Sequence, residues 1–164
     1  MDGHRDNLFE QSADLASFSF NAAVARVFPD MIRRSVPGYD AQLQVVSVIA
    51  HEFAQPGTTL YDLGCSLGGA SYAMARGVPV PDCRVVAVDN APAMLERARQ
   101  MQRSMGEPCR ATPVEFVLGD LEHVPVSGAS VIVLNYTLQF LPVERRLPVL
   151  RRLCSGLRPG GVLV

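Results

Sequence analysis

Short apolar segments alternate with longer segments in which apolar residues recur at helical spacing, and this alternation runs from residue 58 to the end of the chain. Four apolar segments are predicted as strands: 58–63, 84–88, 114–118 and 130–134. Strands without a polar face are typical of a parallel sheet that is covered on both sides. The pattern therefore predicts an α/β fold.

Three segments between and after these strands have the periodicity of amphipathic helices, namely 67–76, 90–105 and 142–157. In the second of them, Asn90 is the expected cap and Pro92 falls in the first turn. Its predicted buried stripe consists of Met94, Leu95, Ala98, Met101 and Met105. Helices of this kind are expected to cover the sheet.

The chain before residue 57 has a helical pattern as well. A short helix is predicted over 21–28 and stopped by Pro29, with a further turn at 30–34. Asp40 is expected to cap a longer helix that ends before Pro56. The apolar stripe of that helix is Leu43, Val46, Ala50 and Phe53.

Strands that alternate with helices favour a Rossmann-like, doubly wound and mostly parallel sheet, because right-handed crossovers leave few other topologies. We expect an N-terminal helical cap at 1–56 and a Rossmann-like ligand-binding domain at 57–164. A turn at Pro159-Gly160-Gly161 leads into only three strand residues, 162–164. The last strands of such a fold are therefore expected to be missing, as in a fragment or a truncated gene product.

Composition narrows the class of protein. The 164 residues suit one domain, 48% are hydrophobic and 19% are charged, and the net charge is −1. This balance argues against a broad nucleic-acid-binding surface. The four cysteines and three histidines have no zinc spacing, so no metal is expected. The N-terminus has no secretory signal pattern and no apolar run could span a membrane, so we expect a cytoplasmic protein.

Polar residues follow the predicted strands, at the edge where open parallel sheets bind ligands. The first strand contains Asp62 and runs into the turn Gly64-Cys65-Ser66-Leu67-Gly68. The next three strands end in Asp89, in Gly119-Asp120 and in Asn135. A carboxylate at Asp89, roughly 25 residues after the turn, stands near the interval at which such folds bind ribose hydroxyls. Asp120 or its neighbouring backbone would meet the exocyclic amine of adenine.

The sequence of the turn also argues against a ligand that contains a pyrophosphate. It reads G-x-S-x-G rather than the G-x-G-x-x-G of pyrophosphate binders, and Asp62 precedes it. A carboxylate there would repel a pyrophosphate and would suit an amino group. The sequence thus favours a nucleoside that carries an amino-acid tail, although Asp62 or Asp120 alone would also serve as a helix cap.

Two rival interpretations of the turn are weaker. G-x-S-x-G is also the nucleophile elbow of α/β-hydrolases, with Ser66 as nucleophile. That fold needs several strands before the elbow and a later acid and histidine, whereas His123 is the one histidine after Ser66 and lies only three residues after Asp120, too near to come from a separate later loop. A reactive thiol at Cys65 lacks a visible resolving cysteine or basic partner.

Longer runs of residues resemble one known family. They are Val-Phe-Pro-Asp-Met-Ile-Arg-Arg-Ser-Val-Pro-Gly-Tyr at 27–39, Tyr-Asp-Leu-Gly-Cys-Ser-Leu-Gly at 61–68, Val-Asp-Asn-Ala-Pro-Ala-Met at 88–94 and Val-Leu-Asn-Tyr-Thr-Leu-Gln-Phe-Leu at 133–141. These runs are similar to the carboxy-S-adenosyl-L-methionine synthases, within the class I S-adenosylmethionine-dependent methyltransferases. The resemblance extends over nearly the whole chain and departs at Asn21-Ala22, where the family tends to carry acids.

The resemblance implies an enzyme that transfers a carboxyl group from prephenate to the methyl of S-adenosyl-L-methionine. The products would be carboxy-S-adenosyl-L-methionine, which a partner enzyme uses to modify the wobble uridine of certain tRNAs, and phenylpyruvate. It also implies a homodimer, and no direct contact with nucleic acid or membrane. An ordinary small-molecule methyltransferase and a non-catalytic S-adenosylmethionine-binding domain remain as alternatives.

Position by position, the resemblance places cofactor contacts on residues of five segments. Asp62, inferred above from its place before the turn, is added to these contacts. The expected cofactor-binding residues are therefore Tyr39, Asp62, Gly64, Cys65, Ser66, Asp89, Asn90, Asp120, Leu121 and Asn135. The arginine with which the family grips the extra carboxylate has no assigned counterpart here, and Arg33 and Arg34 are more typical of a solvated helix end. No catalytic residue is assigned.

Overall fold

The computed structural model describes residues 20–105 and 112–164 and contains one parallel sheet within them. Its strands are β1 (Thr59–Leu63), β2 (Arg84–Asp89), β3 (Val114–Leu118), β4 (Ala129–Val133) and β5 (Leu157–Leu163). Their order across the sheet is β3-β2-β1-β4-β5, and every neighbouring pair is parallel. The order reverses between β1 and β4, so the loops after these two strands leave in opposite directions and open a crevice between them.

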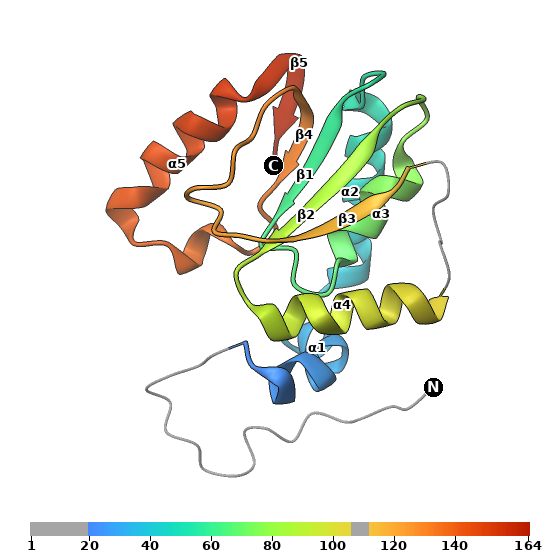
Figure 1. Cartoon of the computed structure of the whole chain (residues 1–164), viewed down its shortest axis with the longest axis vertical. Coiled ribbons are helices and arrows are strands. Elements are labelled where there is room, and N and C mark those ends of the chain that lie inside the picture. The colour runs from blue at the N-terminus through green and yellow to red at the C-terminus, as the bar shows by residue number, and fades with distance from the viewer. Residues whose placement is uncertain (1–19, 106–111) are drawn as a thin grey trace.

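Helices cover both faces of this sheet, as Figure 1 shows. The helices are α1 (Ala22–Ser35), α2 (Tyr39–Phe53), α3 (Gly69–Gly77), α4 (Pro92–Met105) and α5 (Val143–Ser155), with a 3-10 turn, η2 (Leu138–Phe140). Helices α2, α3 and α4 pack on one face, α5 packs on the other, and α1 lies against α4. None of the helices within 20–105 and 112–164 is long and apolar enough to cross a membrane.

Side chains alternate between the two faces of the central strands. Leu60 of β1 packs with α2 and α3, whereas Tyr61 and Leu63 pack with α5. Every residue of β1 and β4 is buried, so the prediction of a parallel sheet covered on both sides is confirmed. The same alternation turns Asp62 toward α3, and this direction matters for the site.

The N-terminal helices differ from the prediction in two places. Pro29 lies inside α1 and does not stop it. Proline removes one helical hydrogen bond, but the neighbouring Phe28, Met31 and Ile32 pack against Leu67 and Met94 and hold the helix together. Asp40 does not cap α2, because Gly38 in a left-handed conformation takes the cap position and the Asp40 carboxylate pairs with Arg33 Nε at 3.3 Å.

Two further local predictions are wrong. At the start of α4 the carboxylate of Asp89, rather than the side chain of Asn90, accepts the hydrogen bond from the Ala91 backbone N–H, at 2.9 Å. Pro159-Gly160-Gly161 does not form a turn that separates α5 from a short strand, because β5 starts at Leu157 and includes it. The register between β4 and β5 shifts there, which accommodates the extra residues.

The other predicted elements agree with the structure to within a few residues, and Met94, Leu95 and Ala98 are fully buried as expected. Phe53 does not belong to the buried stripe of α2, because it is the last residue of the helix and is 40% exposed. The side chain of Met105 lies outside the described residues. The division into a helical cap at 1–56 and a domain at 57–164 stays a prediction.

Candidate functional site

A cavity of about 570 Å³ opens at the carboxyl ends of the strands, where the strand order reverses. All ten residues expected to contact a cofactor line it: Tyr39, Asp62, Gly64, Cys65, Ser66, Asp89, Asn90, Asp120, Leu121 and Asn135. They come from α2, from the ends of β1 and β2, and from the loops after β1, β2, β3 and β4. The structure therefore brings the predicted set together at one crevice.

The loop after β1 is held closely against its neighbours. The backbone N–H groups of Gly64 and Cys65 both donate to the carbonyl oxygen of Val88, at 2.8 and 2.9 Å. Gly64 has φ +84°, and a Cβ at this position would overlap the side chain of Thr137 in the loop after β4. Glycine is therefore required both by the backbone conformation and by the space. The result is a fixed rim on which a ligand can lie close to the backbone.

Asp89 joins this loop to the end of β2. Its Oδ2 accepts a hydrogen bond from the Ser66 backbone N–H at 2.8 Å, and its Oδ1 accepts one from the Ala91 N–H at 2.9 Å. Burial raises the pKa of Asp89, and the backbone N–H donors of Ala91, Ser66 and Asn90 lower it in part. A carboxylate oxygen has more than one lone pair, so both oxygens can still accept from vicinal hydroxyls of a ribose.

Asp62 is the most buried of the acids, with 1% of its surface exposed. The Ser71 hydroxyl of α3 donates to its Oδ2 at 2.6 Å, whereas Oδ1 has no hydrogen-bond partner among the described residues. Burial raises the pKa of Asp62 to about 6, against the lowering effect of Ser71. A buried acceptor without a donor is costly, and a positively charged amino group of a ligand would satisfy it.

The loops after β3 and β4 flank the ends of β1 and β2, one on each side. Asp120 Oδ1 accepts from the Glu122 backbone N–H at 2.8 Å, which folds the loop after β3 into a tight turn. Asn135 follows β4, and its carbonyl accepts from the Thr137 hydroxyl at 3.3 Å. Tyr136, next to it, has φ +58° and donates its hydroxyl to Gln42 Oε1 at 2.6 Å. Both turns are thus fixed by contacts of their own side chains.

Tyr39 reaches the cavity from the first turn of α2. Burial raises the pKa of its hydroxyl, and the negative charge of Asp62 adds to that effect. The phenol is therefore neutral at physiological pH and can both donate and accept a hydrogen bond at the end of the cavity near Asp62.

The rival interpretations of the glycine turn find no support in this geometry. His123 is not among the residues that line the cavity, and its Nδ1 lies 3.7 Å from Asp120 Oδ2 with most of the ring exposed. Ser66 therefore has no histidine base beside it within the described residues. Burial raises the pKa of the Cys65 thiol, which keeps it protonated and unreactive.

An apolar wall of the cavity was not predicted from the sequence. It consists of side chains from α1, from η2 and from Phe20, two residues before α1; among them are Phe20, Phe28, Met31, Ile32 and Phe140. The ring of Phe20 lies edge to face with those of Phe28 and Phe140, with centroids 6.3 and 5.8 Å apart. The runs 27–39 and 133–141 contain four of these five residues, but their role depends on where α1 packs.

Curated relatives match nearly the whole chain. The carboxy-S-adenosyl-L-methionine synthase of Klebsiella pneumoniae is 46% identical over 162 residues, which are 98% of this chain and 64% of that protein. The synthase of Trichlorobacter lovleyi is 48% identical over 92% of this chain and 61% of its own length. The chain thus spans less than two thirds of the length of these relatives, and the expected resemblance is confirmed.

Solved structures and a family model agree on the fold. The structure resembles an S-adenosyl-L-methionine-dependent methyltransferase of Methanococcus maripaludis, with a TM-score of 0.64, 19% identity, and coverage of 87% of this chain and 63% of the other. An O-methyltransferase family protein of Burkholderia thailandensis gives a TM-score of 0.64 and 23% identity over 88% of this chain and 41% of its own. The family described as "Methyltransferase domain" matches residues 60–161. Because this match covers more than half of the sequence, the chain belongs to the methyltransferase domain family.

Proposed function

We propose that this chain is the S-adenosylmethionine-binding part of a carboxy-S-adenosyl-L-methionine synthase, which transfers a carboxyl group from prephenate to the methyl of S-adenosyl-L-methionine. The observation that carries the proposal is an identity of 46 to 48% to synthases of that name over 92 to 98% of this chain. An ordinary small-molecule methyltransferase is the alternative, favoured by the fold alone.

The residues of the cavity fit the cofactor in three places. The free oxygen of Asp62 would accept from the amino group of the methionine part, and its buried negative charge would be compensated there. Asp89 would accept from the ribose hydroxyls, with Asn90 beside it. Asp120 and the backbone of Leu121 would contact the adenine, and Asn135 would close the site from the other side of the crevice.

The chemistry needs the two ligands to lie together in a site that excludes water. When bound, S-adenosylmethionine supplies a methyl group that the adjacent sulfonium makes acidic. In the proposed reaction the donor loses its ring carboxyl and hydroxyl groups, the carboxyl carbon bonds to the methyl carbon, and the methyl proton leaves with the hydroxyl as water. The products are carboxy-S-adenosyl-L-methionine and phenylpyruvate. The wall of Phe28, Met31 and Phe140 would shield this step from solvent.

The proposed cellular location, oligomeric state and use of the product follow from the same resemblance. In the proposed role the enzyme acts in the cytoplasm as a homodimer, and its product serves a partner enzyme that modifies the wobble uridine of tRNA. The chain itself would touch neither nucleic acid nor membrane.

Incubation of this chain and of a full-length synthase with S-adenosylmethionine and prephenate, followed by mass spectrometry, tests the proposal. We expect the full-length enzyme to yield a cofactor heavier by one carboxyl group, and we expect this chain to bind the cofactor in calorimetry with weak or absent turnover. S-adenosylhomocysteine formed in the presence of small-molecule acceptors, without the carboxylated product, would favour the methyltransferase. Binding without any turnover by a longer chain that includes this sequence would favour a non-catalytic domain.

A further inference from the structure

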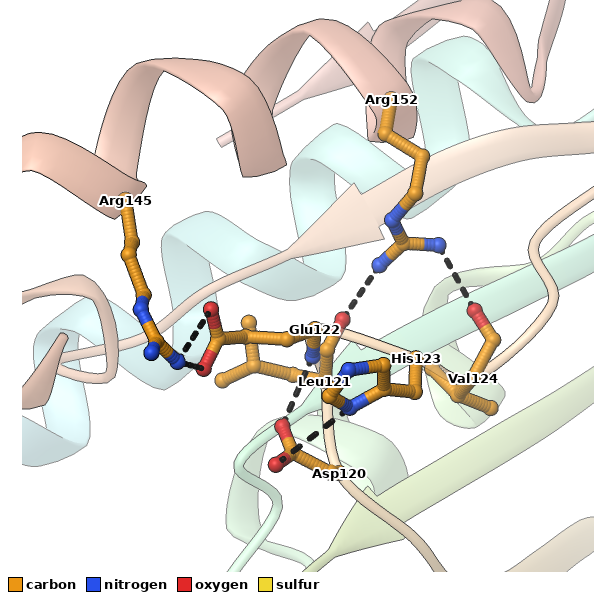
Figure 2. Close-up of polar contacts among 7 residues, drawn as sticks. All are labelled: Asp120, Leu121, Glu122, His123, Val124, Arg145 and Arg152. Carbon is orange, nitrogen blue, oxygen red and sulfur yellow. Dashed lines mark hydrogen bonds and ion pairs between the residues drawn. The ribbon is translucent and has the colours of Figure 1, made fainter.

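Helix α5 contacts the loop after β3 through two arginines on the same side of the helix. Arg145 and Arg152 are seven residues apart, which is about two helical turns, and both point toward residues 120–124, as Figure 2 shows. Neither arginine is among the residues that line the cavity, whereas Asp120, Leu121 and Glu122 of the loop line it. The arginines therefore hold a cavity wall from behind.

Arg152 binds two carbonyl groups of this loop at once. Its Nη1 donates to the Val124 carbonyl at 2.7 Å, and its Nη2 donates to the Leu121 carbonyl. The guanidinium is half-buried, and its rigid fork matches two acceptors in a way that the single ammonium of a lysine cannot. Arg152 thus fixes the spacing of two carbonyls that lie three residues apart.

One of these two peptide groups is also bound by Asp120, on its other side. The Leu121 carbonyl and the Glu122 N–H belong to one peptide unit, and that N–H donates to Asp120 Oδ1 at 2.8 Å. The Val124 N–H, in the peptide unit before the one whose carbonyl Arg152 binds, donates to the Asp120 backbone carbonyl, also at 2.8 Å. A change at Arg152 would therefore tilt the peptide that orients the Asp120 carboxylate, because peptide units are planar and rigid.

Arg145 holds the second carboxylate of the loop. Its Nη1 lies 3.1 Å from Glu122 Oε2, and the Glu122 side chain is only 17% exposed. This ion pair compensates the charge of Glu122 and keeps it on the α5 side of the loop, as Figure 2 shows. Asp120 is then the carboxylate of this loop that remains for a ligand.

We propose that Arg152, supported by Arg145, is a positioning residue that sets the orientation of Asp120 and Leu121 and thereby the selectivity of the cavity for a base with an exocyclic amine. This role rests on the proposed function, since it takes the ligand to be an adenosyl compound. A 6-oxo base such as hypoxanthine presents an acceptor where adenine presents donors, so the Asp120 carboxylate disfavours it only while correctly oriented.

Arg152→Met and Arg152→Lys test this inference, with Arg151→Met as the matched control. Arg151 is exposed on the same helix and makes no hydrogen bond or ion pair with the described residues. Calorimetry would give the affinity of each variant for S-adenosylhomocysteine and for its 6-oxo analogue, S-inosylhomocysteine. Hydrogen exchange of the Glu122 and Val124 amides would report the order of the loop without any ligand.

For Arg152→Met we expect about tenfold weaker binding of the adenosyl compound, an unchanged affinity for the inosyl compound, and faster exchange of both amides. Arg152→Lys would fall between Arg152→Met and wild type, and Arg151→Met would match wild type. Unchanged amide exchange, or an equal loss of affinity for both compounds, would overturn the positioning role. If the wild-type chain binds neither compound, the proposed function itself is wrong and this role falls with it, whereas the amide exchange would still show whether Arg152 orders the loop.

Discussion

The backbone N–H of Ser66 donates a hydrogen bond of 2.8 Å to Oδ2 of Asp89, so the glycine turn after β1 is bound directly to the end of β2. The same carboxylate accepts from the Ala91 N–H and so begins α4. One side chain therefore orders both the turn and the helix start that flank the cavity. Its remaining lone pairs are the ones we assign to the ribose.

Replacement of Asp89 by Asn tests that double role. The amide keeps one acceptor oxygen but loses the charge and replaces the other acceptor by a donor, which opposes the N–H it would face. We expect the affinity for S-adenosylhomocysteine in calorimetry to fall about 10- to 100-fold, the effect of losing one or two charge-assisted hydrogen bonds. Asp82→Asn, at an exposed position with φ +59°, is the matched control and should bind as wild type does. Equal affinities of the two variants would contradict the assignment.

The stability of the ligand-free protein should depend on the protonation of Asp62. Its folded pKa of about 6 lies above the ordinary value of 3.8, so the protonated folded state is favoured. The resulting contribution is fully present below pH 3.8 and is lost as the pH rises through about 6; the difference corresponds to about 3 kcal/mol. Denaturant unfolding of wild type and Asp62→Asn between pH 4 and 8 should show that the variant lacks this decrease. A parallel pH dependence of the two proteins would be evidence against a perturbed Asp62.

Ligand binding should show the opposite trend with pH. An ammonium group beside Asp62 favours the ionised carboxylate and lowers its pKa in the complex. The affinity for S-adenosylhomocysteine is therefore expected to increase as the pH rises toward about 6 and to level off above it. Asp62→Asn should bind more weakly above pH 6 and show a flat profile, and a wild-type affinity that decreases over this range would show that the amino group does not lie there.

Gly64 should tolerate no side chain. Gly64→Ala combines a strained φ of +84° with overlap of the Thr137 side chain, and we expect it to lower the free energy of unfolding by about 3 kcal/mol. Gly57→Ala is the matched control, because Gly57 also has a positive φ, +68°, but a Cβ at that position would meet no atom of the described residues within 4 Å. That variant should lose only about 1 kcal/mol, the backbone strain alone. Thr137→Ala added to Gly64→Ala should recover part of the loss, and losses of similar size at both glycines would contradict the account.

The side-chain cap of α1, the helix that forms part of the cavity wall, should contribute to the stability of the protein. Asn21 Oδ1 accepts from the backbone N–H groups of Ala23 and Val24 at 3.0 and 3.1 Å. Asn21→Ala is expected to cost about 1 kcal/mol of stability in thermal unfolding, whereas Asn21→Asp, an equally good cap, should cost nothing. Destabilisation by the aspartate variant, or none by the alanine variant, would show that this cap does not hold the helix.

The parallel sheet and the clustering of the cavity residues could be predicted from the sequence because both follow from short-range patterns. Buried strands have apolar runs, and the polar residues that end them must meet at one edge once the strands are parallel, which is how Asp62, Asp89 and Asp120 were brought together.

The features that escaped prediction depend on tertiary contacts instead. Pro29 stays inside α1 because its neighbours in the helix pack against Leu67 and Met94, residues that follow it by tens of positions in the chain. The apolar wall forms because side chains of α1 and η2 both contact Phe20. The role of Arg152 depends on its hydrogen bonds to the carbonyls of Leu121 and Val124, which the pattern of an amphipathic helix does not indicate.

An NMR titration of the isotope-labelled chain with S-adenosylmethionine tests the central claim most directly, namely that consecutive strand ends form one adenosyl site. The amides of Ser66, Asn90, Leu121 and Asn135 lie in four different loops around the cavity. We predict that all four shift and that their titration curves share one dissociation constant. Shifts confined to a single loop, or different dissociation constants at different loops, would contradict the account.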